Sequence, residues 1–416
     1  MRLRLPFESA EENLVATETT LYNHREKVAS LFQRLGQRIE ERKIDIFRIL
    51  TNVETFDTAL DEIDKTIRAL GTYHRELDAL LGRSPIGTVF VSLPFNNPLY
   101  SLMLYSFGPL MAGNNVVVRP SAITRSTIED LTLVLPEISD ISGLEFFNGS
   151  GREFIQTASQ SDDVQALIFA GNWENVHRLA PQFPRSKILI YCGSGINPFI
   201  VDRDATEFMT IEAISDLIIS SKIYNSGQDC LCTERILVHK QLCSKLIDRL
   251  EAAVLSIQIG EFGDADADIN PLLGGISDSA EAISKSSPNA NWVVPFKRDG
   301  ALVYPSLALA PISSDLVNAE KFAPIFTVAS FETNEELDRA LDFEYLFGAT
   351  VCGSFSSQTL KLYPHVTRTK TVIANESEDA HVPFGGRRRS GFVKVGSTAR
   401  DGPILYSVET TKPAGK

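Results

Sequence analysis

From Gly87 onward, the sequence alternates short apolar runs with helical stretches, and this pattern limits the folds open to the chain. The apolar runs are residues 88–91, 116–118, 166–169 and 188–190. Strands that are apolar on both faces are typical of parallel sheets covered by helices on both sides. We therefore predict an α/β protein with doubly wound parallel sheets.

A different pattern covers the first part of the chain. Residues from about Ser9 to about Leu81 have the period of long amphipathic helices, and Gly71 is an expected interruption. A second unit of alternating strands and helices begins near Phe199. Because 416 residues exceed what one hydrophobic core usually supports, two domains are expected.

The composition excludes several classes of protein. Hydrophobic residues at 43% and charged residues at 22% are ordinary for a soluble globular protein. The net charge of -13 opposes binding to nucleic acid or to an anionic membrane surface. The opening residues lack the apolar core of a signal peptide, and no segment approaches the roughly 20 apolar residues of a membrane span. We therefore expect a cytoplasmic protein without nucleic-acid or membrane partners.

Cys230 carries the strongest local suggestion of chemistry. The five cysteines are odd in number and sparse, which fits free thiols in a reducing compartment. Cys230 and Cys232 are too closely spaced for a usual zinc pair, so no metal is expected. A reactive cysteine needs nearby donors that favour the thiolate, and the turn at residues 225–227 can supply open backbone N–H groups. On this run alone, a buried structural cysteine is an equally good interpretation.

Distinctive segments follow the apolar runs, at the positions where open parallel sheets bind ligands. They are residues 93–98, 119–122, 170–173 and 192–198, and further distinctive segments are residues 227–230, 320–324 and 383–386. In order and spacing, these segments resemble those of the aldehyde dehydrogenase superfamily. By this resemblance the chain is identified as a member from about Gly87 to about Thr411.

The resemblance implies a division of the chain. Residues 1–84 are the helical N-terminal part of the cofactor-binding domain, and residues 85–198 are the Rossmann-like NAD(P)-binding domain. Residues 199–385 are the catalytic domain, and residues 386–416 are the C-terminal return and oligomerisation strand. The tail is similar to a strand that adds to the sheet of a partner, so a homodimer is expected.

The resemblance also implies roles for single residues. Cys230 matches the nucleophile that forms a hemithioacetal or thioester, and Asn96 matches the amide that holds the oxyanion with the backbone N–H of Cys230. Glu320 and Phe322 match the pair that holds the nicotinamide ribose and packs by the ring. The other implied cofactor contacts are Pro94, Arg119, Ser121, Gly171 and Asn172. The match at Asn172 is imperfect, because Val176 replaces a frequent second glycine.

Arg119 and Ala122 bear on which cofactor is used. Many NAD-preferring relatives have a glutamate at the position of Ala122, where it accepts hydrogen bonds from ribose hydroxyls and repels a 2'-phosphate. Arg119 with Ser121 and no acid at residue 122 would instead attract a phosphate. The sequence therefore favours NADP(H) over NAD(H).

Cys192 stands where hydrolytic relatives carry the glutamate that activates water. Neither Cys192 nor Tyr191 is a natural base at pH 7, since their ordinary pKa values are about 8.5 and about 10. The run at residues 192–198 more closely resembles the glycine-rich turn of CoA-acylating aldehyde dehydrogenases, which also lack the glutamate. We therefore expect interconversion of an aldehyde and an acyl thioester of CoA or a carrier protein, in the reductive direction.

Two alternatives stay open at this point. An ordinary aldehyde dehydrogenase would recruit another base, such as Glu320 acting through a water, and would release a free acid. A non-catalytic binding protein would have kept only the fold, although a structural role requires none of Cys230, Asn96, Glu320 and Phe322.

Overall fold

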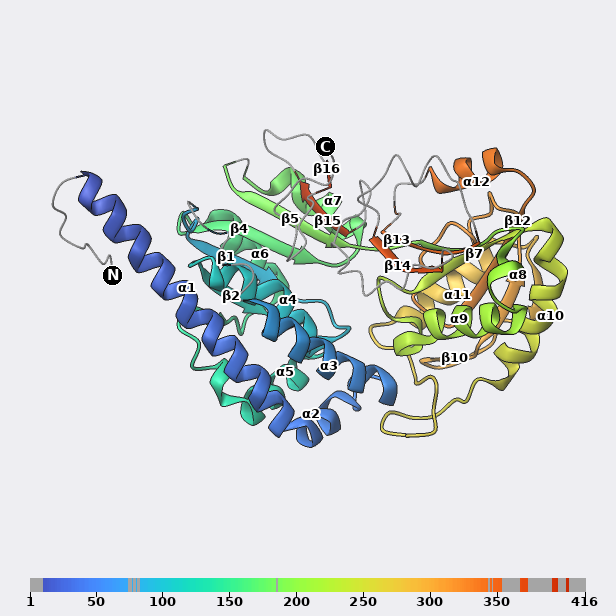
Figure 1. Cartoon of the computed structure of the whole chain (residues 1–416), viewed down its shortest axis with the longest axis horizontal. Coiled ribbons are helices and arrows are strands. Elements are labelled where there is room, and N and C mark those ends of the chain that lie inside the picture. The colour runs from blue at the N-terminus through green and yellow to red at the C-terminus, as the bar shows by residue number, and fades with distance from the viewer. Residues whose placement is uncertain are drawn as a thin grey trace.

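The computed structural model describes residues 10–73, 77, 80, 83–184, 186–342, 345, 347–353, 367–372, 391–395 and 402–403. Within these residues, the chain forms two seven-stranded sheets with helices packed around them (Figure 1). Most strand pairs are parallel, so the predicted doubly wound α/β fold is confirmed.

The first sheet has the strand order β16-β15-β5-β4-β1-β2-β3. Its strands are β1 (Thr88–Ser92), β2 (Asn115–Arg119), β3 (Leu144–Phe146), β4 (Val164–Ala170), β5 (Ile188–Gly193), β15 (Gly391–Val395) and β16 (Gly402–Pro403). The strands from β5 to β3 are parallel, whereas β15 pairs antiparallel with β5. The chain therefore returns to the first sheet near its C-terminus.

The second sheet has the strand order β14-β13-β6-β7-β12-β11-β8. Its strands are β6 (Asn197–Val201), β7 (Thr233–His239), β8 (Asn291–Val294), β11 (Ser306–Leu309), β12 (Ile325–Phe331), β13 (Gly348–Cys352) and β14 (Thr367–Val372). A small hairpin of β9 (Arg298–Asp299) and β10 (Leu302–Val303) lies apart from both sheets. The helices of this half are α8 (Ala205–Phe208), α9 (Ile211–Ile223), α10 (Lys240–Ser256), α11 (Ile276–Ser286) and α12 (Asn334–Leu341).

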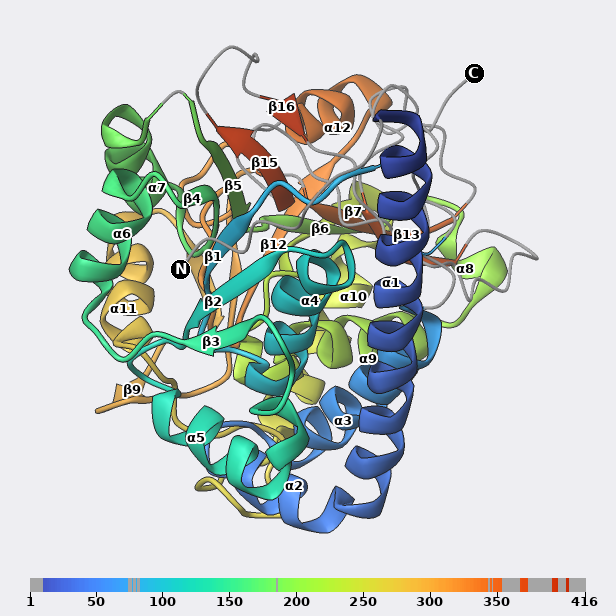
Figure 2. The ribbon, with the colours of Figure 1, turned by 90° about the vertical axis from the view of Figure 1, so that its left-hand side faces the viewer.

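The helices before the first strand are α1 (Ala10–Glu41), α2 (Lys43–Leu50) and α3 (Phe56–Thr72). The expected interruption at Gly71 falls one residue before the end of α3, whose last residue is Thr72. The chain also turns between α2 and α3, where the side chain of Thr55 caps α3 by accepting the N–H of Thr58. Figure 2 shows α1 beside α3, on the side of the sheet that α4 (Pro98–Met111) also covers.

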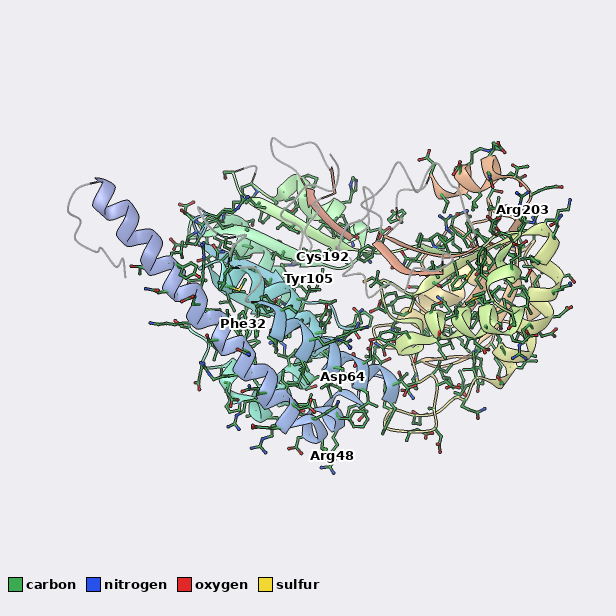
Figure 3. The ribbon with its side chains drawn as sticks, in the orientation of Figure 1. Phe32, Arg48, Asp64, Tyr105, Cys192 and Arg203 are labelled. Atoms are coloured by element: carbon green, nitrogen blue, oxygen red, sulfur yellow. The ribbon has the colours of Figure 1, made fainter. Side chains whose placement is uncertain are left out.

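Aromatic packing joins these helices to α4, which covers the first sheet. Phe32 of α1 stacks on Phe107 of α4, with ring centroids 4.3 Å apart, and meets Tyr73 edge-on at 4.9 Å. Figure 3 shows where Phe32 lies in the molecule. Full burial of a side chain of this size stabilises a fold by about 1.5 to 3 kcal/mol. The N-terminal helices are therefore an integral part of the first domain.

The strands of the first sheet alternate between two cores, which explains why they are apolar on both faces. In β1, Val89 and Val91 pack into the core under α1, α3 and α4, and Phe90 packs into the core on the other face. That second core includes Phe154 of α6 (Gly151–Gln160) and Val176 of α7 (Trp173–Leu179), and α5 (Arg125–Val134) completes the helices of this half.

The oligomerisation strand predicted in the tail lies outside the described residues, as does the segment at residues 383–386. The homodimer therefore stays a prediction. In the part of the chain that the structure describes, none of the helices combines the length and apolarity needed to span a membrane.

Candidate active site

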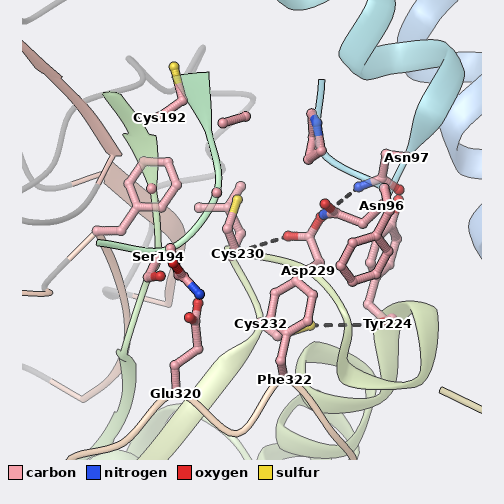
Figure 4. A pocket seen from close by; sticks show the side chains of 18 of the residues that line it. Asn96, Asn97, Cys192, Ser194, Tyr224, Asp229, Cys230, Cys232, Glu320 and Phe322 are labelled. Atoms are coloured by element: carbon pink, nitrogen blue, oxygen red, sulfur yellow. Dashed lines mark hydrogen bonds between the residues drawn. The ribbon is translucent and has the colours of Figure 1, made fainter. Parts of the chain in front are cut away.

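A cavity of about 1140 Å³ opens at the carboxyl ends of the parallel strands of the first sheet and extends to the second sheet. All of the predicted site residues except Arg119 line it. The residues brought together are Pro94, Asn96, Ser121, Gly171, Asn172, Cys230, Glu320 and Phe322. Figure 4 shows how Cys230, Glu320 and Phe322 surround this space. This volume lies slightly above the usual range for ligand sites, roughly 300 to 1,000 Å³, and suits a large ligand.

Arg119 lies close to the cavity's end of the first sheet but outside its lining. It ends β2 but is not among the described residues that line the cavity. Its guanidinium lies beside Gly151, where a Cβ atom would be 3.4 Å from the Arg119 Cζ atom. The buried Nε of Arg119 lacks a hydrogen-bond partner among the described residues, and burial together with the nearby Arg125 lowers the pKa of Arg119. This unpaired donor could bind an anion that reaches beyond the cavity.

The turn before Cys230 is held by buried hydrogen bonds. Asn225 and Ser226 adopt left-handed conformations, with φ values of 48° and 58°. The backbone N–H of Asn225 donates to the Thr58 hydroxyl at 2.9 Å, and the Ser226 hydroxyl accepts the N–H of Asn270 at 2.8 Å. The prediction that this turn offers open N–H groups to the thiolate is therefore wrong for Asn225, because its amide is used to fix the turn.

Cys230 lies in a negatively charged part of the cavity. Burial raises the pKa of its thiol well above the usual range, and the charges of Asp229 and Glu320 raise it further. The backbone N–H of Cys230 acts in the opposite sense by favouring the thiolate. The thiol is therefore protonated at neutral pH and needs a proton acceptor before it attacks a carbonyl carbon.

Asn96 and Asn97 connect β1 to α4 at the same end of the cavity. Asn97 has a left-handed conformation with a φ of 47°, and its amide donates to the Asp229 carboxylate at 2.7 Å (Figure 4). The Ser101 hydroxyl donates to the backbone carbonyl of Asn96 at 3.1 Å. These contacts tie the segment that carries Asn96 to the segment that carries Cys230.

Two buried carboxyl groups missed by the sequence analysis lie behind this loop. Glu54 and Glu62 are each 1% exposed, and Glu62 accepts the N–H of Tyr100 at 2.8 Å. Burial, followed by the charge of Glu62, raises the pKa of Glu54 well above its usual range, and burial raises the pKa of Glu62 to about 7. Glu62 thus caps the first turn of α4 and supports the loop that carries Asn96.

Replacement of Glu62 with glutamine is expected to change how stability depends on pH. The folded-state pKa of about 7 exceeds the ordinary 4.5, so folding favours the protonated carboxyl. Its stabilising contribution is complete below pH 4.5 and is lost as the pH rises through 7. Because an amide does not titrate, the stability of Glu62→Gln relative to the wild type should rise by a few kcal/mol over this range, at about 1.4 kcal/mol per pKa unit.

Chemical denaturation at about pH 5 and about pH 8 measures this change. The matched control is Glu332→Gln, which alters an exposed carboxylate paired with Lys240. Its effect on the free energy of unfolding should be the same at both pH values. A stability difference for Glu62→Gln that does not vary with pH would contradict the assignment.

Glu320 and Phe322 lie on the other side of Cys230, in the loop before β12. The Glu320 carboxylate accepts the N–H of Gly195 at 3.0 Å, and burial, followed by the charge of Glu234, raises its pKa to about 7. A Cβ atom at Gly195 would lie 2.2 Å from the carbonyl oxygen of Cys230, so glycine is required where these segments meet. The Phe322 ring meets Phe95 edge-on at 6.1 Å, which joins this loop to the one that carries Asn96.

The surroundings of Cys192 decide whether this thiol can act as a base. Cys192 is the last residue but one of β5 and lies in the core of the first sheet, at the wall of the cavity and close to Tyr105. Figure 4 shows its sulfur directed away from Cys230. Burial raises the pKa of the Cys192 thiol well above its usual range, and burial also raises the pKa of Tyr191. Neither Cys192 nor Tyr191 is therefore suited to activating water at neutral pH.

Asn172, in contrast, has a structural contact outside this core. It caps α7 by accepting the N–H of Asn175 at 3.0 Å.

The chain is similar to known proteins over most of its length. The aldehyde dehydrogenase family model matches residues 4–401. A lactaldehyde dehydrogenase of Methanococcus aeolicus is 26% identical over 88% of this chain and 83% of its own length. A 3-sulfolactaldehyde dehydrogenase of Priestia aryabhattai is 24% identical over 94% of this chain and 83% of its own length.

Solved structures have the same fold. The lactaldehyde dehydrogenase of Escherichia coli superposes with a TM-score of 0.78 at 19% identity, and the match covers 95% of this chain and 89% of that one. The glyceraldehyde-3-phosphate dehydrogenase GapN of Methanocaldococcus jannaschii, solved with NADP, superposes with a TM-score of 0.76 at 20% identity. That match covers 94% of this chain and 92% of the other.

Proposed function

The chain belongs to the aldehyde dehydrogenase family, and on this premise we propose that it interconverts an aldehyde and an acyl thioester, chiefly in the reductive direction. The observation that carries this proposal is the residue at the end of β5. Where hydrolytic relatives have a glutamate, Cys192 is buried in the core with a pKa raised well above its usual range. Without an activated water, the acyl group on Cys230 leaves by transfer to a thiol or by reduction.

The proposed cofactor is NADP(H), with NAD(H) as the alternative. A nicotinamide, when bound, supplies or accepts the hydride of this chemistry. The residues present fit such a group, because the buried Glu320 carboxyl and the Phe322 ring line the cavity beside Cys230. Pro94, Ser121 and Gly171 line the part of the cavity at the ends of the first-sheet strands. The unpaired buried Nε of Arg119, with Arg125 nearby, supports a preference for the additional phosphate of NADP(H).

The protein groups have separate roles in this proposal. Acylation breaks the bond between the acyl carbon and the thiol of the donor, forms the thioester on Cys230, and releases the donor as a free thiol. A carboxyl with a pKa of about 7, such as Glu320, is suited to accept the Cys230 proton at neutral pH. Asn96 and the backbone N–H of Cys230 stabilise the oxyanion. Addition of hydride and a proton then releases the aldehyde and regenerates the Cys230 thiol.

Oxidation of an aldehyde to a free acid is the second candidate function. The observation that favours it is Glu320, because a carboxyl with a pKa of about 7 could also activate a water molecule. Relatives named for lactaldehyde and 3-sulfolactaldehyde indicate that small polar aldehydes belong among the substrates to be tested.

A paired assay tests the proposal. In one arm, the protein is mixed with NADPH or NADH and a set of acyl-CoA and acyl-N-acetylcysteamine thioesters. In the other arm, it is mixed with an aldehyde set and the oxidised cofactor, with and without CoA. We expect thioester-dependent oxidation of the reduced cofactor and CoA-dependent formation of acyl-CoA. Free acid formed at a rate indifferent to CoA would contradict the proposal, and absence of turnover in both arms would support a non-catalytic protein.

The cofactor preference is measured separately by binding isotherms for NADPH and NADH. Tighter binding of NADPH is expected, and Arg119→Ala should remove the difference between the two affinities. The control is Arg203→Ala, which changes an arginine far from the cavity in the second domain (Figure 3). Tighter binding of NADH by the wild type would overturn the preference.

A further inference from the structure

A buried cluster of charges lies behind the loop that carries Glu320 and Phe322, and the roles assigned above do not use it. The cluster consists of Glu234 at the start of β7, Lys222 near the end of α9, and Lys321 between the two cofactor residues. Each of the three is 1% exposed. Burying a charge is costly unless it is paired and hydrogen-bonded, so this cluster calls for an explanation.

Glu234 is the centre of the cluster. Its Oε1 atom lies 3.0 Å from the Lys222 Nζ and accepts the backbone N–H of Phe322 at 3.0 Å. Its Oε2 atom accepts the backbone N–H of Lys321 at 3.0 Å and lies 3.4 Å from the Lys321 Nζ. The same Lys321 ammonium donates to the backbone carbonyls of Glu234 and Leu316.

The two backbone contacts of Glu234 support an unfavourable backbone conformation in the loop. Phe322 has a left-handed conformation with a φ of 51°, which is unfavourable for an aromatic residue. The loop therefore requires outside support to keep this conformation, and the Glu234 carboxylate accepts the N–H groups of both Lys321 and Phe322. A carboxylate that receives two N–H groups is a stronger anchor than a neutral acceptor.

Stability alone does not account for the cluster. An apolar group of similar volume often stabilises a fold as well as a buried ion pair does. The position of Glu234 suggests another reason, because it follows Cys230 by four residues and its strand β7 pairs with β12. Its carboxylate therefore connects the segment of the nucleophile directly to the loop of the proposed cofactor residues. Its charge also raises the pKa of Glu320, whereas the charge of Lys222 lowers it.

We propose that Glu234 is a positioning residue that holds the Glu320 and Phe322 loop at a fixed place relative to Cys230, with Lys222 and Lys321 neutralising its charge. This inference rests on the proposed cofactor roles of Glu320 and Phe322, and it is independent of whether the acyl group leaves to a thiol, to hydride or to water. It predicts that loss of the Glu234 carboxylate impairs cofactor binding more than it impairs the reactivity of Cys230.

Glu234→Gln tests this prediction, because the amide nitrogen is a donor and would face a backbone N–H or an ammonium group. We expect the Kd for NADPH, measured by fluorescence titration, to rise about tenfold or more. Cofactor-dependent turnover should fall on the order of 10²-fold, since small misplacements have effects of this size. Alkylation of Cys230 by iodoacetamide without cofactor is compared at about pH 9, above the Glu320 pKa of about 7, so that Glu320 is ionised in both proteins, and it should stay within about threefold of the wild-type rate.

Lys222→Met is the matched control within the same cluster. It removes a buried charge but leaves the Glu234 carboxylate to accept both backbone N–H groups. We expect a lower melting temperature with a Kd for NADPH near the wild-type value. If Glu234→Gln alone does not fold, the double variant Lys222→Met with Glu234→Gln is tested in its place. In this variant the Lys222 ammonium, which would otherwise be buried without its carboxylate partner, is also removed. Impaired NADPH binding in that double variant supports the proposal.

Two results would overturn the proposal. One is wild-type NADPH affinity in a folded variant that lacks the Glu234 carboxylate. The other is a parallel loss of affinity and melting temperature in Glu234→Gln and Lys222→Met, which would show a purely structural cluster. A wild-type protein that binds neither NADPH nor NADH would instead refute the cofactor roles of Glu320 and Phe322, so the two failures are distinguishable.

Discussion

Replacement of Cys230 with alanine is expected to lower turnover by about 10⁴-fold or more, because the covalent step then has no nucleophile. Steady-state turnover of the best thioester or aldehyde substrate measures this loss. Intact-protein mass spectrometry after mixing with that substrate should show an acyl adduct on the wild type and none on Cys230→Ala. Thermal melting should change little, because the altered side chain lines a cavity and leaves no void in the core.

Cys232→Ala is the control for this experiment. Cys232 is 3% exposed, and its thiol donates to the backbone carbonyl of Tyr224. Its loss should cost stability more than activity, because this thiol packs beneath the turn that precedes Cys230. Activity that survives in Cys230→Ala and disappears in Cys232→Ala would show that the nucleophile has been misassigned.

Replacement of Asn96 with alanine is expected to lower kcat by roughly 10²- to 10³-fold, which corresponds to about 2.7 to 4 kcal/mol of transition-state stabilisation. The reason is that one of two proposed donors to the oxyanion is removed while Cys230 and the cavity stay in place. The rate of Cys230 alkylation by iodoacetamide should be nearly unchanged, since that reaction forms no oxyanion. Steady-state kinetics together with the alkylation rate measure both effects.

Asn97→Ala separates this role from a general effect on the loop. The Asn97 amide donates to Asp229, so its loss loosens the same loop without removing the proposed oxyanion donor. We expect a fall in kcat of less than about tenfold for this control. Equal losses in Asn96→Ala and Asn97→Ala would indicate that Asn96 acts only through the loop conformation.

The fold was predictable because its signals are local. Apolar runs such as residues 88–91 and 166–169 reveal strands buried on both faces, and turn residues mark where those strands end. The carboxyl ends of parallel strands lie at one edge of a sheet, so the segments around Asn96 and Gly171 could be expected to meet. Cys230 precedes β7 of the second sheet, and the family resemblance alone predicted that it joins them. The cavity contains all three.

The parts that could not be predicted depend on contacts between distant segments. Glu62 meets the N–H of Tyr100 across 38 residues, and Glu234 meets the N–H of Lys321 across 87 residues. A glutamate in an amphipathic helix or at the start of a strand has the same local pattern whether it is exposed or buried. The two were missed for this reason.

Arg119 shows a further limit of local patterns. It stands at the predicted end of β2, but the direction of its side chain depends on α6, where Gly151 leaves room for the guanidinium. Gly71, in contrast, was a useful local signal, because α3 ends one residue after it, at Thr72.

The lifetime of the acyl group on Cys230 distinguishes transfer to a thiol or hydride from hydrolysis. The protein is acylated with an acyl-CoA in the absence of cofactor, excess donor is removed, and the adduct is followed by intact-protein mass spectrometry in buffer, with CoA, or with NADPH. We predict that the adduct persists in buffer and is removed at least about tenfold faster by CoA, as free acyl-CoA, or by NADPH, as aldehyde. Rapid loss in buffer alone, with release of the free acid and no acceleration by CoA, would contradict the account.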